Sequence, residues 1–332
     1  MNQIVYISSA NSHQIEVWSL NNDLSLNLIQ IVKLDSEPQS IVILNNKKCL
    51  YVGVRPKFYI YSYKIEIDGT LTYVTKTSMT HNINHLELDK NERYVFSSSY
   101  HFNCISVSPI DSLGIPGSST QTIREIKGCH ASLMHNNNTN LFISSLKEDR
   151  IYLYNFTEEG ILLKHKYTFL QLKNNSGPRH ILFQKNLNRL FSINELSGTI
   201  SVSNVDESLN TIILLKNISI IPKSYNALHA WSSDIHISPC KKYLYASDRN
   251  NNNIIILQNS ININDLKVIK YIPTETQPRS FAIGIDGTCL IVVGEQSNKM
   301  SIYRVDNETG LLEFKNRYPT GERPVWISIY AI

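Results

Sequence analysis

The stretch from Gly177 to Val202 reads GPRHILFQKNLNRLFSINELSGTISV, and it contains three short apolar runs separated by polar turns. A Gly-Pro turn opens the first run, a polar turn at 185–189 precedes the second, and a Ser-Gly turn precedes the third. Runs of this length bounded by Gly, Pro, Asn and Ser are typical of β-strands joined by tight turns. Arg179 and Glu195 lie where strands begin and end rather than inside them, and the whole unit recurs along the chain.

The second run of each unit marks a repeat of nearly constant length. These markers begin at Val5, Leu50, Val95, Leu141, Leu190, Leu244 and Leu290. Successive markers are 45, 45, 46, 49, 54 and 46 residues apart, which matches a four-stranded propeller blade of about 40–50 residues. Helical periodicity is missing from almost all of the chain. We therefore predict an all-β fold, a seven-bladed β-propeller with four-stranded antiparallel blades.

The two ends of the chain complement each other. The first copy starts at its second strand, whereas Arg323 to Tyr330 resembles a first strand without a second strand after it. Pairing residues 323–332 with residues 3–9 would close the ring and remove two sheet edges that invite aggregation. No linker or shift in composition divides the chain, so we expect a single domain over residues 1–332, with its last blade built from both termini.

The composition is that of a globular protein without a general affinity for nucleic acid or membranes. The chain has 42% apolar and 18% charged residues and a formal net charge of +4, which leaves room only for a local basic pocket for a phosphorylated or acidic small molecule. We expect no signal peptide, no membrane span and no cofactor. The odd number of scattered cysteines favours reduced thiols and a cytoplasmic protein. No sequence feature decides the oligomeric state, and we expect a monomer.

The longest interval between markers contains extra residues at Lys216 to Ala230. We interpret this excess as a surface loop between blades, and a lid over the axial mouth is the alternative.

Two columns of residues should converge at one end of the central channel, because the first strands line that channel in a propeller. The first column lies eleven residues before each marker and the second lies five residues after it. Residues that serve the fold should be alike in every copy, but these differ and are rich in charge, as expected for one asymmetric site on a pseudo-symmetric axis. The first column contains Gln39, Asn84, His130, Arg179, Ser233 and Arg279, and the second contains Arg55, Tyr100, Leu146 (with Lys147 as a substitute), Glu195, Arg249 and Glu295.

The residue types in the columns indicate acid–base chemistry on an anionic substrate. The arginines, with Lys147, offer cationic donors for a phosphate, a carboxylate or a developing oxyanion. Glu195 and His130 are the candidate bases. This set suits attack by water on a strained ester or lactone, and it equally suits proton abstraction beside a carboxylate. Two structural alternatives remain open: Arg179 and Glu195 could pair only to tie loops together, and His130 could be a satisfied channel residue.

Other candidate residues are assigned structural roles. We interpret His85, His180 and His236 as structural, and no His spacing predicts a metal site. We expect the tryptophans to pack between blades: Trp18, Trp231 and Trp326. The chain contains no GxSxG, GxGxxG or P-loop motif.

Several motifs together resemble the seven-bladed propeller lactonase (cycloisomerase-like) family, in particular its bacterial branch. They are GCHAS at 128–132, GPRHILF at 177–183, NEL at 194–196, DRNNNNIIIL at 248–257 and TQPRSF at 276–281. The resemblance extends over essentially the full chain, from YVGVRPKF at 51–58 to RPVWISI at 323–329. The combination is much more specific than a generic propeller pattern.

The resemblance implies hydrolysis of 6-phospho-D-glucono-1,5-lactone to 6-phosphogluconate, the second step of the oxidative pentose phosphate pathway. It also implies a catalytic set of one His, one Glu and two Arg, which by motif are His130, Glu195, Arg179 and Arg249. We add Arg279, Lys147 and Arg55 as binding residues for the substrate phosphate. Two other functions stay open at this point: a cycloisomerase acting on a muconate-like dicarboxylate, and a non-enzymatic propeller that binds proteins.

Overall fold

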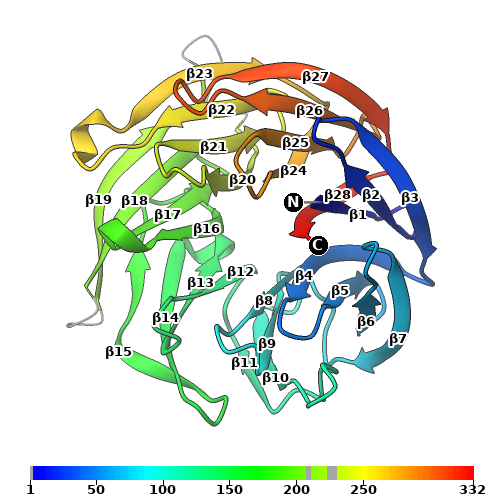
Figure 1. The fold of residues 1–332 in the computed structure, drawn as a ribbon. Coiled ribbons are helices and arrows are strands. Elements are labelled where there is room, and N and C mark those ends of the chain that lie inside the picture. Colours follow the sequence, from blue (N-terminus) through cyan, green and yellow to red (C-terminus); the bar gives the residue numbers. More distant parts are fainter. Residues whose placement is uncertain (1–2, 207–210, 223–229) are drawn as a thin grey trace.

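The computed structural model describes residues 3–206, 211–222 and 230–332. Over these residues the chain forms seven four-stranded antiparallel sheets arranged around a central axis (Figure 1). The predicted seven-bladed β-propeller is therefore confirmed. Among the same residues, no helix reaches the length and apolarity that a membrane crossing requires.

In six of the seven blades the strand nearest the axis comes first in the chain, and the outermost strand comes last. The six blades built from consecutive strands are β4 (Glu37–Leu44), β5 (Cys49–Arg55), β6 (Tyr59–Ile65) and β7 (Leu71–Ser78); β8 (His85–Leu88), β9 (Tyr94–Ser99), β10 (Cys104–Pro109) and β11 (Gln121–Arg124); β12 (Cys129–Met134), β13 (Asn140–Ser145), β14 (Arg150–Phe156) and β15 (Leu162–Gln171); β16 (Pro178–Gln184), β17 (Arg189–Asn194), β18 (Thr199–Asp206) and β19 (Thr211–Ser219); β20 (Ser232–Ile237), β21 (Tyr243–Asp248), β22 (Asn253–Gln258) and β23 (Lys267–Pro273); β24 (Pro278–Ile283), β25 (Cys289–Gly294), β26 (Lys299–Val305) and β27 (Leu312–Pro319). Short 3₁₀ turns occur at Leu146–Glu148, Lys185–Leu187 and Ile263–Asp265.

The remaining blade joins the two ends of the chain. Its innermost strand is β28 (Pro324–Ala331), followed by β1 (Gln3–Ser9), β2 (Gln14–Leu20) and β3 (Leu26–Lys33). β28 pairs antiparallel with β1, with Tyr6 opposite Ser328 and Gln3 opposite Ala331. Both termini consequently lie beside the central axis in Figure 1. Closure by the shared blade agrees with the prediction.

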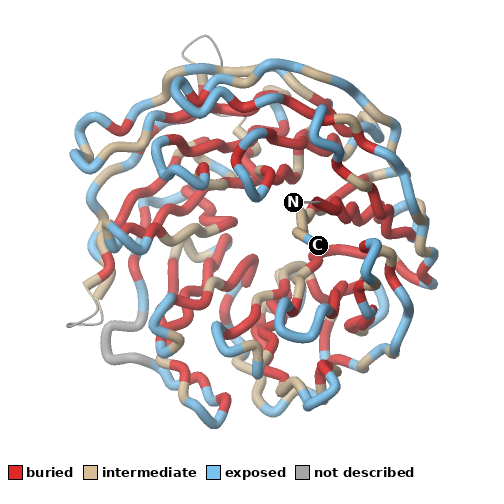
Figure 2. The backbone as a smooth tube through the Cα atoms, in the orientation of Figure 1, coloured by how far each residue is buried: buried red, intermediate tan, exposed pale blue. Residues whose placement is uncertain are grey.

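The hydrophobic core lies between neighbouring blades rather than inside one layer. Ile4 and Tyr6 of β1 pack against Leu50 and its neighbours in the next blade, whereas Val5 packs against the preceding blade. A middle strand is thus buried on both faces, which explains why its sequence is continuously apolar instead of alternating. The outer strands alternate between exposed and partly buried residues, so that exposed segments gather at the rim in Figure 2.

Buried tyrosines tie adjacent blades together at a repeated position. The hydroxyl groups of Tyr6, Tyr51 and Tyr245 each donate to the carbonyl of a turn glycine that lies 63 or 65 residues later. Each bond satisfies a hydroxyl that would otherwise be buried without a partner, at a cost of about 1–3 kcal/mol. The repeat therefore provides, in these three copies, a hydrogen bond between adjacent blades as well as the strand pattern.

The excess at Lys216 to Ala230 is only partly described. Its first residues continue β19, because the pairing runs on until Ser219 lies opposite Thr199. The loop interpretation is therefore wrong for residues 216–219, and residues 223–229 lie outside the described part. Four of the five cysteines are buried, Cys240 is exposed, and all five are free thiols.

Candidate active site

The first column is placed by a bulge at the start of the innermost strands. In the blade of Gly177, Pro178 pairs with Asn194 but Ile181 pairs with Ser192, so Arg179 and its neighbour lie in the bulge. The same shift occurs in β4, β12, β20, β24 and β28, at Gln39, His130, Ser233, Arg279 and Val325. A bulge re-aims a side chain without ending the strand. The side chains of the column-one residues in these strands therefore do not follow the regular alternation between the two faces of the sheet.

The second column is held by a repeated backbone hydrogen bond. The amide of Glu195 donates to the carbonyl of Gly177 at 2.7 Å, and the amide of Arg249 donates to Trp231 at 3.0 Å. Glu295 is held in the same way by Gln277 at 2.8 Å. Each acceptor lies two residues before a column-one residue. Both columns are consequently fixed to one end of the channel by backbone geometry.

Glu195, Arg179 and Arg249 form a compact cluster at this end of the channel. Oε2 of Glu195 lies 2.7 Å from an Nη of Arg249 and 3.1 Å from Nε of Arg179. The two arginine side chains are 2–3% exposed, and that of Glu195 is 17% exposed. The Arg249 guanidinium also covers the ring of Trp231 at 3.9 Å. Two buried cations thus share one oxygen of one carboxylate.

The cluster carries an excess of positive charge. Burial lowers the pKa of Arg179 to about 10, with further repulsion from Arg279. Burial and the charge of Arg179 lower the pKa of Arg249 to about 9. The single carboxylate only partly compensates these effects. An additional anion would relieve this repulsion, so the site is suited to a negatively charged group or a developing oxyanion.

His130 lies beside this cluster but does not contact Glu195 among the described residues. Its ring is 5.3 Å from that of His180 and 6.2 Å from that of Tyr100. Burial, followed by the charge of Arg179, holds the pKa of His130 well below its usual range. Its Nδ1 is buried and has no hydrogen-bond partner within the described residues. His130 is therefore a neutral imidazole with an unused nitrogen.

The three predicted phosphate-binding residues each have a different partner. An Nη of Arg279 is 3.3 Å from Glu295. Burial would raise the pKa of Glu295, but Arg279, Arg323 and Arg249 together lower it. Arg55 donates to Gln39, and burial together with Arg279 lowers the pKa of Arg55 to about 10. Lys147 lies 4.7 Å above the ring of Tyr100. Arg279 and Arg55 therefore share one electrostatic environment, and burial together with the charges of Arg55 and Lys147 lowers the pKa of His101.

A second layer beneath the first column was missed by the sequence analysis. Nε2 of His180 lies 3.0 Å from an Nη of Arg179, and its Nδ1 lies 2.7 Å from Asp234. Although burial alone would raise the pKa of Asp234, His236 and His180 hold it well below its usual range. The position directly after the first column would have indicated this layer. Its members are Ser40, His85, Ala131, His180, Asp234, Ser280 and Trp326.

The layer changes how the histidines and tryptophans are interpreted. His180 supports Arg179 directly, and the ring of Trp326 lies 5.7 Å from His180 in the channel. Trp18 packs with Tyr318 of the neighbouring blade, as expected. The prediction of packing between blades is wrong for Trp231. This residue occupies the position two residues before the first column, and its ring covers the guanidinium of Arg249. No group of His, Cys, Asp and Glu among the described residues is arranged to hold a metal ion.

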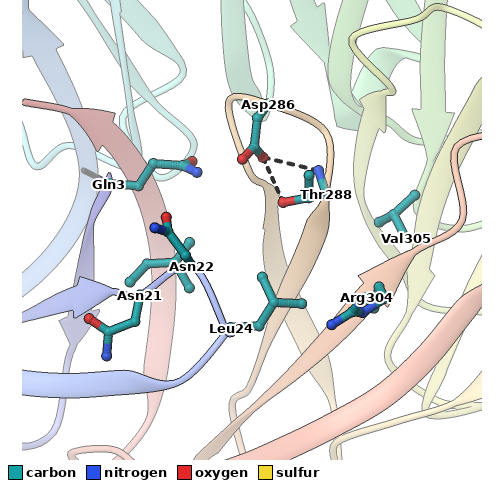
Figure 3. Close-up of a pocket in the computed structure, with 9 residues that line it drawn as sticks. Gln3, Asn21, Asn22, Leu24, Asp286, Thr288, Arg304 and Val305 are labelled. Atoms are coloured by element: carbon teal, nitrogen blue, oxygen red, sulfur yellow. Dashed lines mark hydrogen bonds between the residues drawn. The ribbon is translucent and has the colours of Figure 1, made fainter. Parts of the chain in front are cut away.

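A partly open hollow lies at the opposite end of the molecule and borders none of the predicted site residues. It is lined by the turn at 21–24 and the turn at 286–288, together with Gln3 and Arg304. The two turns join β2 to β3 and β24 to β25 at the strand ends that lie away from the two columns. Figure 3 shows the residues that line the hollow. Some of the polar groups that line the hollow are already hydrogen-bonded to each other, since Asp286 accepts from Thr288. The carboxylate–arginine cluster is therefore the better candidate for chemistry.

Comparison with known proteins gives the family. Residues 4–329 match the family model described as "Lactonase, 7-bladed beta-propeller". The chain is 53% identical to a 6-phosphogluconolactonase of Buchnera aphidicola subsp. Baizongia pistaciae over 329 residues, covering 99% of each chain. It is 35% identical to a 6-phosphogluconolactonase of Klebsiella pneumoniae over 332 residues, covering all of both chains.

Solved structures share the fold at lower sequence identity. The periplasmic gluconolactonase of Pseudomonas aeruginosa superimposes with a TM-score of 0.91 at 18% identity, covering 100% of this chain and 99% of that one. A putative 6-phosphogluconolactonase of Bacteroides fragilis gives a TM-score of 0.90 at 21% identity, with 99% and 98% coverage. With the full-length family match and these relatives, the chain belongs to the lactonase family of seven-bladed β-propellers.

Proposed function

We propose that this protein is a 6-phosphogluconolactonase that hydrolyses 6-phospho-D-glucono-1,5-lactone to 6-phosphogluconate. The observation that carries the proposal is the cluster at the channel mouth, in which Arg179 and Arg249 bind one oxygen of Glu195. The activity named for relatives up to 53% identical supports the same reaction.

Glu195 acts as the general base in this proposal. Both guanidinium contacts use Oε2, so Oε1 is the oxygen that accepts a proton from water. The water oxygen then forms a bond to the lactone carbonyl carbon, and the carbonyl oxygen becomes an oxyanion. As the oxyanion collapses, the bond to the ring oxygen breaks and that oxygen takes the proton from Glu195. The product is a hydroxy acid, which ionises to the carboxylate.

Arg179 and Arg249 stabilise the oxyanion, and His130 assists as a neutral imidazole facing the substrate. A preorganised donor of this kind contributes about 3 kcal/mol to lowering the barrier. Since a δ-lactone already hydrolyses in water, a few such groups are enough for effective catalysis. Arg279, Lys147 and Arg55 are proposed to bind the phosphate.

The test is turnover of 6-phosphogluconolactone by the wild type and by Glu195→Gln, after subtraction of spontaneous hydrolysis. We expect kcat to fall by about 100-fold or more, because the variant lacks a proton acceptor. Glu308→Gln is the control, since Glu308 is 85% exposed and pairs only with Lys242 among the described residues. Thermal denaturation of both variants separates loss of the base from loss of the fold. An unchanged rate in folded Glu195→Gln would remove Glu195 from the mechanism.

A further inference from the structure

The blade that closes the ring supplies no charged residue from either column. Its column-one residue is Val325 and its column-two residue is Ala10, and both are buried. Every other blade places at least one polar or charged side chain there. We call this closing blade, in which β28 pairs with β1, the seam of the propeller. At the seam the two columns leave a gap in the ring of charged side chains around the mouth, unless a residue at another position fills it.

Arg323 fills that gap from the position two residues before the first column. Its Nε lies 3.1 Å from Oε1 of Glu295 in the preceding blade. One of its Nη atoms lies 3.7 Å from Glu37 in the following blade. The Arg323 side chain is 35% exposed, so it reaches both neighbours while it remains open to solvent. It thus connects three blades at the rim of the mouth.

Two further arginines belong to the same group. Arg279 binds the same Glu295 carboxylate as Arg323, at 3.3 Å. Arg55 lies directly opposite Glu37 in the strand register, and its Nε is buried with no hydrogen-bond partner within the described residues. Arg279 and Arg323 pair with these two carboxylates, whereas Arg55 feels their charge but donates to Gln39 instead. This leaves one surplus positive charge and a free donor beside the catalytic cluster.

The backbone of Arg323 gives independent support for a role beyond stabilising the seam. Its φ is +54°, a left-handed conformation that costs a side-chain-bearing residue about 1–2 kcal/mol. The equivalent positions with positive φ are Gly128, Gly177 and Gln277. Glycine serves this turn at no such cost in two other blades. An arginine that is retained in this conformation is consistent with a functional use of its guanidinium.

We propose that Arg323 is a specificity-determining residue that, with Arg279 and Arg55, binds the 6-phosphate and selects phosphorylated over unphosphorylated lactones. This inference rests on the proposed lactonase function and adds a residue to it. The position fits the substrate, because the ring oxygen, C5 and C6 separate the phosphate from the reacting carbonyl carbon, so that a phosphate site would adjoin the cluster without overlapping it. Arg279 and Glu295 adjoin the cluster of Arg179 and Arg249, as their mutual electrostatic effects indicate. The phosphate dianion would balance the surplus charge.

The rival explanation is that Arg323 only ties the seam together through its two ion pairs. The two explanations differ in the ratio of kcat/KM for 6-phosphogluconolactone to kcat/KM for glucono-1,5-lactone. Selection of the phosphate makes this ratio depend on Arg323, whereas a seam contact affects both substrates alike. The ratio, measured together with the melting temperature, is therefore the readout.

The test variant is Arg323→Gln, because glutamine occupies the same backbone conformation at Gln277 with an identical φ of +54°. We expect the ratio to fall by about 30-fold, since a hydrogen bond to a charged group contributes enough for a factor of about 10–100. Arg323→Lys should lose less, because it keeps the charge but not the fork of donors. Arg304→Gln is the matched control at the opposite end of the molecule (Figure 3), where the ratio should not change.

Other variants decide against the proposal if it is wrong. Glu37→Gln breaks one ion pair of the seam. Under the rival explanation both Glu37→Gln and Arg323→Gln lower the melting temperature and lower kcat/KM for the two lactones alike, so that the ratio does not change. A ratio within about twofold of wild type in active Arg323→Gln overturns the proposal. So does a fall that appears in Lys147→Gln but not in Arg323→Gln, since Lys147 and not Arg323 would then select the phosphate. If wild type hydrolyses neither lactone, the proposed function itself fails, and this outcome is distinct from the others.

Discussion

At the scale of single residues, the site depends on an imbalance of buried charge. Arg179 and Arg249 share one carboxylate, and the support for Arg179 comes from a neutral histidine rather than from a second anion. Burial, followed by the charge of Arg179, lowers the pKa of His180 to about 4 despite its bond to Asp234. A neutral His180 accepts from Arg179 without adding another cation to the cluster.

The low pKa of His180 makes the stability of the protein sensitive to acid. Below a pH of about 6.5 the unfolded chain binds a proton at His180 that the folded chain rejects until about pH 4. This contribution is complete above pH 6.5 and is lost as the pH falls, by about 2 kcal/mol between pH 7 and pH 5. We expect His180→Asn to show a shallower loss of unfolding free energy over this range.

Urea denaturation at pH 7 and pH 5 provides the measurement for wild type and His180→Asn. His13→Asn is the control, because His13 is exposed and has a positive φ that asparagine tolerates. The same pH dependence in wild type and His180→Asn would show that His180 does not titrate as described. A shallower dependence in His13→Asn would point to histidines in general rather than to the channel.

At the scale of elements, a conserved geometry within the repeat aims the functional side chains. A bulge at the start of every inner strand except β8 re-aims the first column, and the carbonyl two residues earlier holds the second column at Glu195, Arg249 and Glu295. Gly177 takes part in both features, since it precedes the bulge and accepts from Glu195. Strand pairing and site geometry are therefore coupled at one glycine.

We expect Gly177→Ala to impair both stability and activity. The φ of Gly177 is +66°, and an added Cβ would lie 2.6 Å from Cγ of Leu196. The left-handed conformation alone costs about 1–2 kcal/mol, and displacement of Glu195 should lower kcat/KM by about tenfold. Urea denaturation and lactone turnover measure the two effects.

A second substitution separates the two causes. Leu196 is 46% exposed and can be shortened without opening the core. Leu196→Ala in the Gly177→Ala background should restore the part of the loss that is due to crowding, but not the part due to φ. Gly117→Ala is the control, because its Cβ would meet nothing closer than 3.4 Å. Equal effects at Gly117 and Gly177 would contradict the assignment.

At the scale of the whole molecule, the active site exists only in the closed ring. Glu195 and Arg249 come from adjacent blades, whereas Arg323, Glu37 and Glu295 meet only across the seam. The seam is formed by the pairing of β28 with β1, whose two faces are both buried. Loss of β28 would expose the edge of β1 and the apolar surfaces beside it.

We therefore expect a chain that ends at Arg323 to lose cooperative unfolding and to aggregate, because an open, apolar strand edge pairs with other chains. A synthetic peptide of residues 324–332 should restore soluble protein and lactone turnover by adding the missing strand. Removal of Ile332 alone is the control, since this residue lies outside β28. Cooperative unfolding of the truncated chain without peptide would refute the dependence on ring closure.

The repeat, the number of blades and most of the two columns could be predicted from the sequence. The blades could be counted because each repeats a pattern of apolar runs and turns that is visible in one sequence without an alignment. The columns could be found because they are the few repeat positions at which the charge differs from copy to copy. Arg179, Glu195, Arg249 and Arg279 follow from spacing alone. The strand pairing of residues 216–219 was missed, because Lys216 and Asn217 interrupt the apolar run at 212–215 and make the chain beyond it look like a loop.

The tertiary structure decided which of those residues touch and which others join them. A bulge shifts a strand by one or two residues, and its position depends on partner strands rather than on local sequence. His180, Asp234 and Trp231 therefore entered the site from positions beside the columns. Arg323 lies next to Glu37 only because the two ends of the chain pair in one blade. Contacts between residues so far apart in the sequence depend on ring closure, and a local sequence pattern does not predict them.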